Sequence, residues 1–416
     1  MSKIVRIPIN NVYADGDYTG RVFVGAKKKP MNVLLDTGSS AFALNVSKYR
    51  PAAGDKTTRL AQTQSYADNS SWTGAVIQTT VSVGDDGSSV TATGINAAIA
   101  YKHSRDMFGK TDGILGLAYA PLDDAYRMEK DTWSHRYTAR SVKNGKEHAI
   151  VPYLMQLKKK GGMPDKFSFQ TKRSLVHRGG AGADDPLNQG WMIIGGGEES
   201  KELYSGKFET VKVLSDEWYS TNLMAISVGD KPVIPVRERG NTGTVSNSIV
   251  DSGTNSLVLG RHLRALILED FTPGQRALLS RSISEKSDNR PISMSRLNLA
   301  AWPDIIFILQ GLHGDVRIRV RPRDYWQVNA PKVGVATAAI TAGDGGSHIL
   351  GLFHDFRWRS RRWQRRRQIR AEQMVSPLGG EGQDFRSTET KNPSVSVRAG
   401  VISRPASDTS TARRKR

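Results

Sequence analysis

Two short segments of this chain carry the same arrangement of residue types. The first reads Val-Leu-Leu-Asp-Thr-Gly-Ser-Ser over 33–40, and the second reads Ser-Ile-Val-Asp-Ser-Gly-Thr-Asn over 248–255. In each segment an apolar strand ends in Asp, and a hydroxyl residue and a glycine follow. One such segment alone is a common turn, but a pair of them can bring two carboxylates, Asp36 and Asp251, face to face.

Two carboxylates within hydrogen-bond distance cannot both be ionised, because their like charges repel strongly in a partly desolvated cleft. The pair retains one proton. It then offers an ionised oxygen that takes a proton from water and a protonated oxygen that donates to a carbonyl, which are the two functions that amide hydrolysis needs. The pKa values belong to the pair, so neither aspartate is assigned as base or acid. This chemistry requires no metal and no organic cofactor.

The residues that follow the aspartates suit this chemistry, and they form three matched pairs: Thr37 and Ser252, Gly38 and Gly253, and Ser39 and Thr254. The first pair can form hydrogen bonds across to the opposite half of the molecule. The glycines let the backbone approach closely and supply N–H donors to the carboxylates. The third pair can orient the outer carboxylate oxygens.

Each aspartate segment is followed later in the chain by a second repeated motif. Asp-Gly-Ile-Leu-Gly-Leu stands at 112–117, and Ser-His-Ile-Leu-Gly-Leu stands at 347–352. The repeat indicates a duplicated lobe. Two lobes related by an approximate two-fold axis would place one aspartate of each at their shared boundary.

The remaining pattern is typical of a mostly β protein. Runs rich in Val, Ile and Thr and bounded by turn residues predict strands at 20–25, 31–35, 75–83 and 90–100. Apolar periodicity predicts helices at 149–160 and 261–267. We expect a bilobal fold with a central cleft, divided into an N-terminal lobe, a C-terminal lobe and a tail: residues 1–188, 189–352 and 353–416. The polar stretch 171–188 serves as the connector.

The charge of the chain is concentrated in its tail. Residues 352–416 hold sixteen Lys or Arg against six Asp or Glu, which is half of the net charge of +20. The composition beyond residue 352 predicts disorder, and a shift of coding frame near Leu352 would produce such a segment. The Arg-rich run 357–370 has interleaved aromatic residues and could bind nucleic acid or an acidic partner. A solvated tail without function is the alternative.

Composition also bears on the compartment. The chain contains no cysteine, which excludes disulfides and thiolate metal sites and favours a reducing environment. No apolar stretch resembles a signal peptide core or a membrane span. From these features we expect a cytoplasmic protein that contacts no membrane.

Several motifs together resemble the pepsin-type aspartic endopeptidases, over about residues 15–352. They are the two aspartate segments, Tyr-Thr-Gly at 18–20, Asp-Gly-Ile-Leu-Gly-Leu-Ala-Tyr at 112–119, Phe-Ser-Phe at 167–169, Gly-Gly at 195–196 and Tyr-Ser-Gly at 204–206. In lacking cysteine and a propeptide, the chain looks like bacterial members of this family. The resemblance implies the pepsin-like bilobal fold, with Asp36 and Asp251 as the catalytic pair.

The same resemblance implies a flap over the cleft, and it also exposes two departures. The family's flap tyrosine corresponds to Tyr66. Many members have a Trp seven residues after the first Asp that bonds this tyrosine, but the position here is Ala43, so the flap is held otherwise, through Trp72. The family's closing apolar strand is not recognisable after Leu352, and we expect the second lobe to lack its last strands.

The function implied by the resemblance is hydrolysis of peptide bonds flanked by hydrophobic residues, in a monomer that statine-type inhibitors block. Thr254 follows the second motif as in members that work in acid, so the expected pH optimum is acidic. The competing hypothesis is an inactive protease-like scaffold that binds peptides or, through its basic tail only, nucleic acid or acidic partners.

Overall fold

The computed structural model describes most of the chain up to residue 373. The described residues are 4–11, 18–66, 68–85, 88–105, 107–109, 111–171, 189–204, 208–236, 246–254, 256–283, 290–329, 332–343, 348–351, 356–361 and 368–373. The chain divides into a compact unit, Met1–Val375, and a second unit, Ser376–Arg416, which lies outside the described residues. The connector predicted at 171–188 also lies outside them, except for Thr171.

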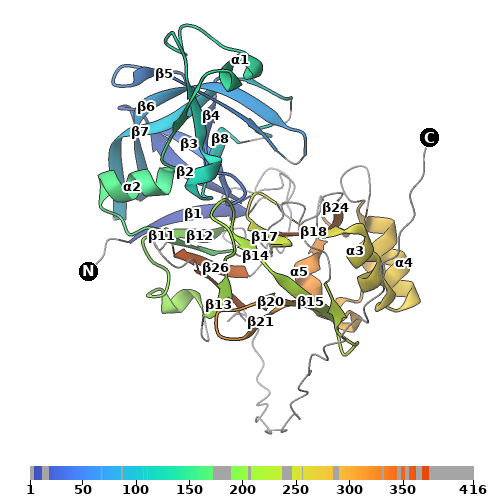
Figure 1. The fold of residues 1–416 in the computed structure, drawn as a ribbon. Helices are drawn as coiled ribbons and strands as arrows, with labels where there is room; N and C mark the ends of the chain where they lie inside the picture. The colour runs from blue at the N-terminus through green and yellow to red at the C-terminus, as the bar shows by residue number, and fades with distance from the viewer. Residues whose placement is uncertain are drawn as a thin grey trace, which may run out of the picture. The chain divides into compact units, whose positions relative to one another are not determined.

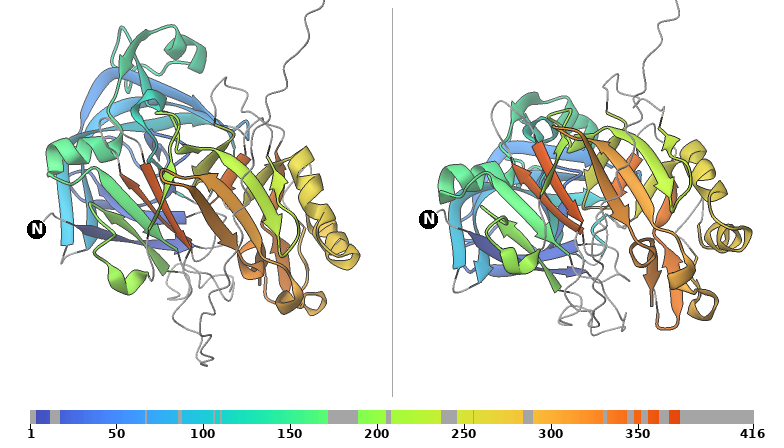
Figure 2. Two further views of the ribbon diagram at one scale, coloured as in Figure 1. Left: turned by 60° about the horizontal axis from the view of Figure 1, so that its bottom comes forward. Right: turned by 90° about the horizontal axis from the view of Figure 1, so that it is seen from below.

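One large sheet contains the strands of the first lobe and the strands that join it to the second (Figures 1 and 2). In spatial order its strands are β10 (Lys146–Ala149), β9 (Asp124–Arg127), β5 (Lys56–Ser65), β6 (Ser71–Asp85), β7 (Ser88–His103), β4 (Phe42–Asn45), β8 (Gly113–Gly116), β3 (Lys29–Asp36), β2 (Tyr18–Val24), β1 (Val5–Asn11), β12 (Gln189–Ile194), β11 (Lys166–Gln170), β26 (Phe356–Arg361), β27 (Gln368–Gln373) and β13 (Glu209–Lys212).

The second lobe is built from three smaller sheets. The first has the order β14 (Ser220–Thr221), β17 (Ser248–Asp251), β25 (His348–Gly351), β18 (Leu257–Gly260) and β24 (Ile340–Gly343). The second has the order β16 (Ile234–Pro235), β15 (Leu223–Val228), β20 (Ile305–Gln310) and β21 (Asp315–Val320). The third has the order β19 (Ile292–Ser293), β23 (Val335–Ala338) and β22 (Trp326–Val328). The mostly β, bilobal prediction is confirmed.

Helices are short and lie at the edges of the lobes. They are α1 (Ala139–Lys143), α2 (Tyr153–Gly161), α3 (Arg261–Glu269), α4 (Pro273–Ser282) and α5 (Pro322–Tyr325), with 3₁₀ turns η2 (Ala120–Leu122), η4 (Lys201–Leu203), η5 (Met294–Arg296) and η6 (Leu299–Ala301). Helix α3 starts where it was predicted. The other predicted helix begins four residues late, because Pro152 restricts the residue before it and takes the N-cap position of α2.

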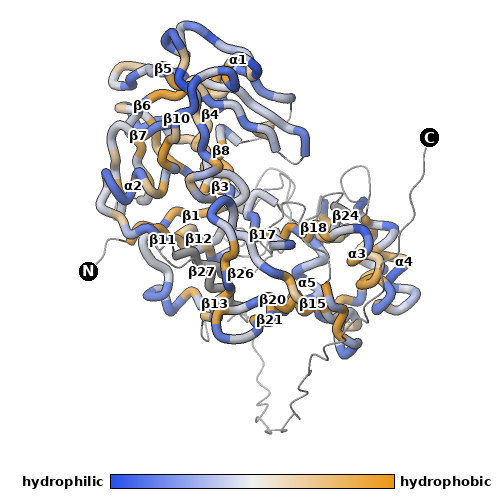
Figure 3. The backbone as a smooth tube through the Cα atoms, viewed as in Figure 1, coloured by the Kyte–Doolittle hydropathy of each residue, from blue (hydrophilic) through white to orange (hydrophobic). Residues whose placement is uncertain are grey.

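Alternating burial explains why the central strands form where the sequence predicted them. In β3, Met31, Val33 and Leu35 are buried while Asn32 is exposed, which is the period of a strand with one face on the core. Figure 3 shows hydrophobic stretches along the strands, whereas many of the turns between them are hydrophilic. The β3 strand therefore delivers Asp36 from a buried, rigid element.

The internal repeat of the sequence corresponds to a repeated pattern of strand pairing in the two lobes. Strand β8 runs parallel to β3 with Asp36 opposite Gly116, and β25 runs parallel to β17 with Asp251 opposite Gly351. In each lobe the Ile-Leu-Gly strand is also paired antiparallel on its other side, with β4 or with β18. The two aspartates thus occupy equivalent positions, as a duplicated lobe predicts.

The glycine of each Ile-Leu-Gly strand lies where the backbone that follows the aspartate of the same lobe passes very close to it. A Cβ atom at Gly116 would lie 2.3 Å from the carbonyl carbon of Ser40, and one at Gly351 would lie 2.4 Å from the carbonyl oxygen of Thr254. The Leu117 N–H donates to the carbonyl of Asp36 at 2.7 Å. The repeated strands therefore support the aspartate loops, and only glycine fits at their ends.

Residues 356–361 and 368–373 correct the expectation that the second lobe lacks its last strands and that the tail is disordered from residue 353 onward. They form the hairpin β26–β27, in which β26 pairs with β11 and β27 pairs with β13 (Figure 2). In the sequence of β26, Phe356 and Trp358 alternate with arginines. This is the period of a strand, and the high arginine content obscured it.

The predicted lobe boundary at residue 188 falls between β11 and β12, which pair with each other along Phe167–Gln170. The two lobes therefore share a sheet rather than a simple linker. Within the described ranges, no helix has the length and apolar character to cross a membrane.

Candidate active site

Hydrogen bonds between the two aspartate loops join the lobes. The Thr37 N–H donates to Ser252 Oγ at 2.9 Å, and the Ser252 N–H donates to Thr37 Oγ1 at 2.8 Å. Each hydroxyl then donates to a strand of the other lobe: Thr37 Oγ1 to the Val250 carbonyl at 3.0 Å, and Ser252 Oγ to the Leu35 carbonyl at 2.5 Å. Both side chains are buried, so the exchange fixes the position of one loop against the other.

Each carboxylate is held by its own loop in the same way. Asp36 accepts from the N–H of Gly38 at 2.7 Å and from the hydroxyl of Ser39. Asp251 accepts from the N–H of Gly253 at 2.8 Å and from the hydroxyl of Thr254 at 2.8 Å. Like the links formed by Thr37 and Ser252, these bonds match the three residue pairs that the sequence singled out.

The glycines bring the carboxylates together across the boundary between the lobes. A Cβ atom on Gly38 would lie 2.7 Å from Asp251 Oδ1, and one on Gly253 would lie 2.5 Å from Asp36 Oδ1. Each carboxylate therefore occupies the space that a side chain on the opposite glycine would fill.

Burial, followed by the negative charge of Asp251, raises the pKa of Asp36 well above its ordinary value. Hydrogen bonds from Ser39 and from the Gly38 N–H oppose the rise. The direction is that of a carboxyl pair that keeps one proton, and the proton belongs to the pair rather than to one residue.

Tyr66 lies at the tip of the β5–β6 hairpin, close to the first aspartate. The Trp72 indole N–H donates to its hydroxyl at 3.1 Å. Burial and the charge of Asp36 raise the pKa of the Tyr66 hydroxyl, while hydrogen bonds with Trp72 and Ser39 lower it. The hydroxyl therefore stays protonated beside the pair.

A family model described as "Eukaryotic aspartyl protease" matches residues 17–144 and 183–353, which is more than half of the chain. The chain belongs to the pepsin-like family of aspartic proteases. Both aspartate loops, the flap hairpin and both Ile-Leu-Gly strands lie within the match, whereas β26 and β27 lie beyond it.

Curated relatives agree with the family at low identity. Rhizopuspepsin-2 of Rhizopus niveus is 26% identical over 280 residues, which cover 64% of this chain and 60% of the relative. Beta-secretase of Strongylocentrotus purpuratus is 28% identical over 264 residues, which cover 58% of this chain and 43% of the relative. The chain thus spans about half the length of these relatives. They are fungal and animal proteins, so they do not support the expectation of a bacterial type.

The hairpin that carries Tyr66, the predicted flap tyrosine, is contacted by a tryptophan of β6. Trp72 on β6 is buried in a cluster that contains Ala43 and Ile114, with Tyr66 packed against it. The indole of Trp72 therefore packs against Ala43. Ala43 occupies the position at which many pepsin-like proteases carry a tryptophan. The structure supports the prediction that Trp72 contacts the flap tyrosine.

Two aromatic residues near the aspartates were missed by the sequence analysis. The Trp218 indole N–H donates to the carbonyl of Gly38 at 2.9 Å, and the Tyr219 hydroxyl donates to the carbonyl of Leu117 at 2.9 Å. The available signal was a pair of adjacent aromatics in a polar stretch just before β14. In the described part of the chain, no three His, Asp or Glu side chains gather in a way that could hold a metal ion.

Replacing Thr37 by valine tests the link between the lobes. Val retains the shape of Thr but leaves the Ser252 N–H and the Val250 carbonyl without their partner. We expect the free energy of unfolding to fall by about 2–4 kcal/mol, because buried unpaired groups cost about 1–3 kcal/mol each. Urea denaturation measures the change. The matched control is Thr93→Val on the exposed face of β7, and equal stability of the two variants would contradict the prediction.

Proposed function

We propose that this chain is an aspartic endopeptidase, in which Asp36 and Asp251 jointly activate a water molecule. The observation that carries the proposal is the placement of each carboxylate against the glycine of the opposite lobe. This geometry leaves both carboxylates facing one shared space, and the raised pKa of Asp36 supports a singly protonated pair.

The chemistry follows from that pair. The ionised carboxylate takes a proton from water as the water oxygen attacks the peptide carbonyl carbon, and the protonated carboxyl donates its proton to the carbonyl oxygen. The resulting tetrahedral gem-diol collapses when the pair gives its proton to the amide nitrogen and the C–N bond breaks, while a hydroxyl of the gem-diol returns one proton to the ionised pair. One water is consumed, and the pair ends with the single proton with which it began.

Tyr66 is proposed to cover the bound peptide. Its hydroxyl accepts a hydrogen bond from Trp72 and lies close to Ser39 and Asp36, which supports this role. We further propose that hydrophobic residues flank the scissile bond, that a statine-type compound inhibits the enzyme and that the chain acts as a monomer. These finer points rest on the family, and neither the family match nor the relatives favour the alternative of an inactive binding scaffold.

Removing either carboxylate tests the proposed pair. We expect Asp36→Asn and Asp251→Asn each to lower kcat/KM for a peptide by at least about 10³-fold, because one ionised and one protonated carboxyl are both required. Cleavage of a fluorogenic peptide at acidic pH measures the loss. Asp230→Asn, an exposed and unpaired carboxylate among the described residues, is the control for loss of charge. Cleavage that survives either active-site substitution would remove the dyad mechanism.

The pH profile tests the shared proton. The pKa of Asp36 is raised to about 8, so the pair keeps its proton at neutral pH and loses it as the pH rises through that value. Activity also falls in strong acid, where the pair holds two protons and has no ionised oxygen to act as base. We therefore expect kcat/KM to peak below pH 7. Circular dichroism at each pH controls for unfolding, and a peak at alkaline pH is the contrary result.

Trp72→Phe tests the flap. Phenylalanine keeps an aromatic ring in the cluster but cannot donate to the Tyr66 hydroxyl. We expect kcat/KM to fall by about fivefold, since one hydrogen bond contributes about 1 kcal/mol to ordering the flap. Trp133→Phe, in a partly buried site bordered by Arg136, is the matched control. Equal activity of the two variants would show that the bond does not order the flap.

A further inference from the structure

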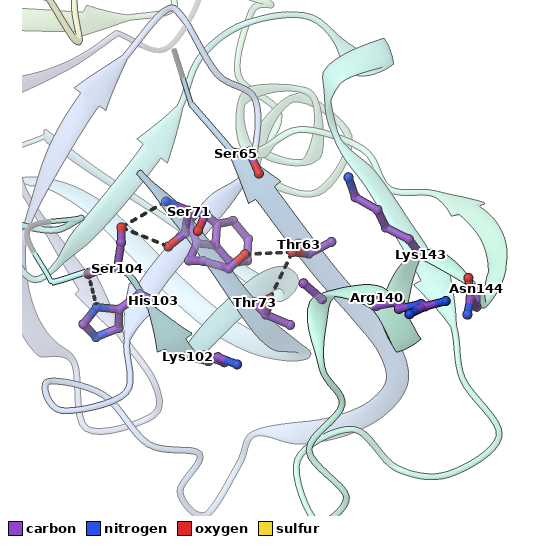
Figure 4. Close-up of a pocket in the computed structure, with 12 residues that line it drawn as sticks. Thr63, Ser65, Ser71, Thr73, Lys102, His103, Ser104, Arg140, Lys143 and Asn144 are labelled. Atoms are coloured by element: carbon purple, nitrogen blue, oxygen red, sulfur yellow. Dashed lines mark hydrogen bonds between the residues drawn. The ribbon is translucent and has the colours of Figure 1, made fainter. Parts of the chain in front are cut away.

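A cavity of about 680 Å³ lies on the flap side of the first lobe, outside the active site (Figure 4). Strands β5, β6 and β7 form its floor, and helix α1 forms its wall. The residues that line it are Thr63, Ser65, Ser71, Trp72, Thr73, Lys102, His103, Ser104, Ala139, Arg140, Lys143 and Asn144.

Part of the cavity floor is the face of the flap sheet that carries Thr63, Thr73 and Lys102. Thr63 pairs with Thr73 across β5 and β6, and Thr73 pairs with Lys102 across β6 and β7, so these side chains share one face. Successive side chains of a strand point to opposite faces, and Trp72 therefore projects away from them, toward Tyr66. The cavity and the aspartate pair lie on different sides of this hairpin.

The cavity is positively charged. Lys102, Arg140 and Lys143 are exposed, and none of them forms an ion pair within the described residues. No described residue that lines the cavity is acidic. Three cationic side chains thus line one cavity, and none of them has an ion-pair partner within the described residues.

Neutral donors complete the lining. The hydroxyls of Ser65 and Ser71 and the side-chain amide of Asn144 line the cavity, and within the described part of the chain they donate no hydrogen bond. Hydroxyl and amide donors beside lysine and arginine are the groups that bind phosphate oxygens. The guanidinium of Arg140 offers a planar fork that can bind two oxygens of one phosphate.

We propose that this cavity binds a compact oligophosphate. Three cations match an anion with several charges, and a cavity of about 680 Å³ has room for a chain of two or three phosphate groups. The site uses none of the residues of the aspartate pair, so the inference stands independently of peptide cleavage.

Calorimetric titration of the full chain with inorganic triphosphate at low ionic strength tests the proposal, without peptide present. We expect Lys102→Gln combined with Lys143→Gln to weaken this binding by at least about tenfold, because charge-assisted hydrogen bonds dominate it. The control exchanges two other exposed lysines, Lys27→Gln with Lys56→Gln, and removes the same charge. It should change the affinity by less than about twofold.

Hydrogen exchange locates the ligand, because the Arg-rich run 357–370 also attracts phosphate. Protection of backbone amides at 71–73 and 102–104 on addition of triphosphate supports the cavity. Protection confined to 357–370 overturns the proposal, as does equal weakening in the two double variants. Binding of citrate with no binding of triphosphate overturns the choice of phosphate.

Discussion

The exchange of hydrogen bonds between Thr37 and Ser252 is the constraint on which the active site depends. It joins two loops that belong to different lobes, and it does so with buried groups that have no water to replace a lost partner. Once the loops are fixed, Gly38 lies against Asp251 and Gly253 lies against Asp36. The proximity of the carboxylates is a consequence of this link, and it adds to burial, the larger cause, in raising the pKa of Asp36.

The duplicated strands explain why both loops can meet symmetrically. Each aspartate ends a strand that is paired in parallel with an Ile-Leu-Gly strand, in the same register. Gly116 and Gly351 allow the crossing backbone to pass at a distance that no Cβ atom tolerates. Two lobes with the same local geometry then need only one set of bridging bonds to align their carboxylates.

The meeting of the two aspartate loops could be predicted because the residues of each loop are contiguous in the sequence. Asp36 and the three residues after it match Asp251 and the three residues after it in type and order. This match can be recognised without knowledge of the fold. Trp218 could not be found this way, since its bond to the Gly38 carbonyl depends on tertiary placement. The hairpin β26–β27 was missed because its arginine content masks a period-two pattern, and its pairing with β11 is a long-range contact. Amino-acid composition predicts a strand poorly where pairing with a distant strand stabilises it.

The flap hairpin separates two sites of opposite charge. On one face, Trp72 packs against Ala43 and holds Tyr66 beside a carboxylate pair. On the other, the same stretch of β6 borders a cavity with three cations. Because β-strand side chains alternate between faces, the side chains of Trp72 and Thr73 lie on opposite faces of the hairpin although the two residues are adjacent in sequence. A ligand that orders the backbone at Thr73 would therefore also restrict the tryptophan that positions the flap tyrosine, so the cavity could influence the active site without contact with the substrate.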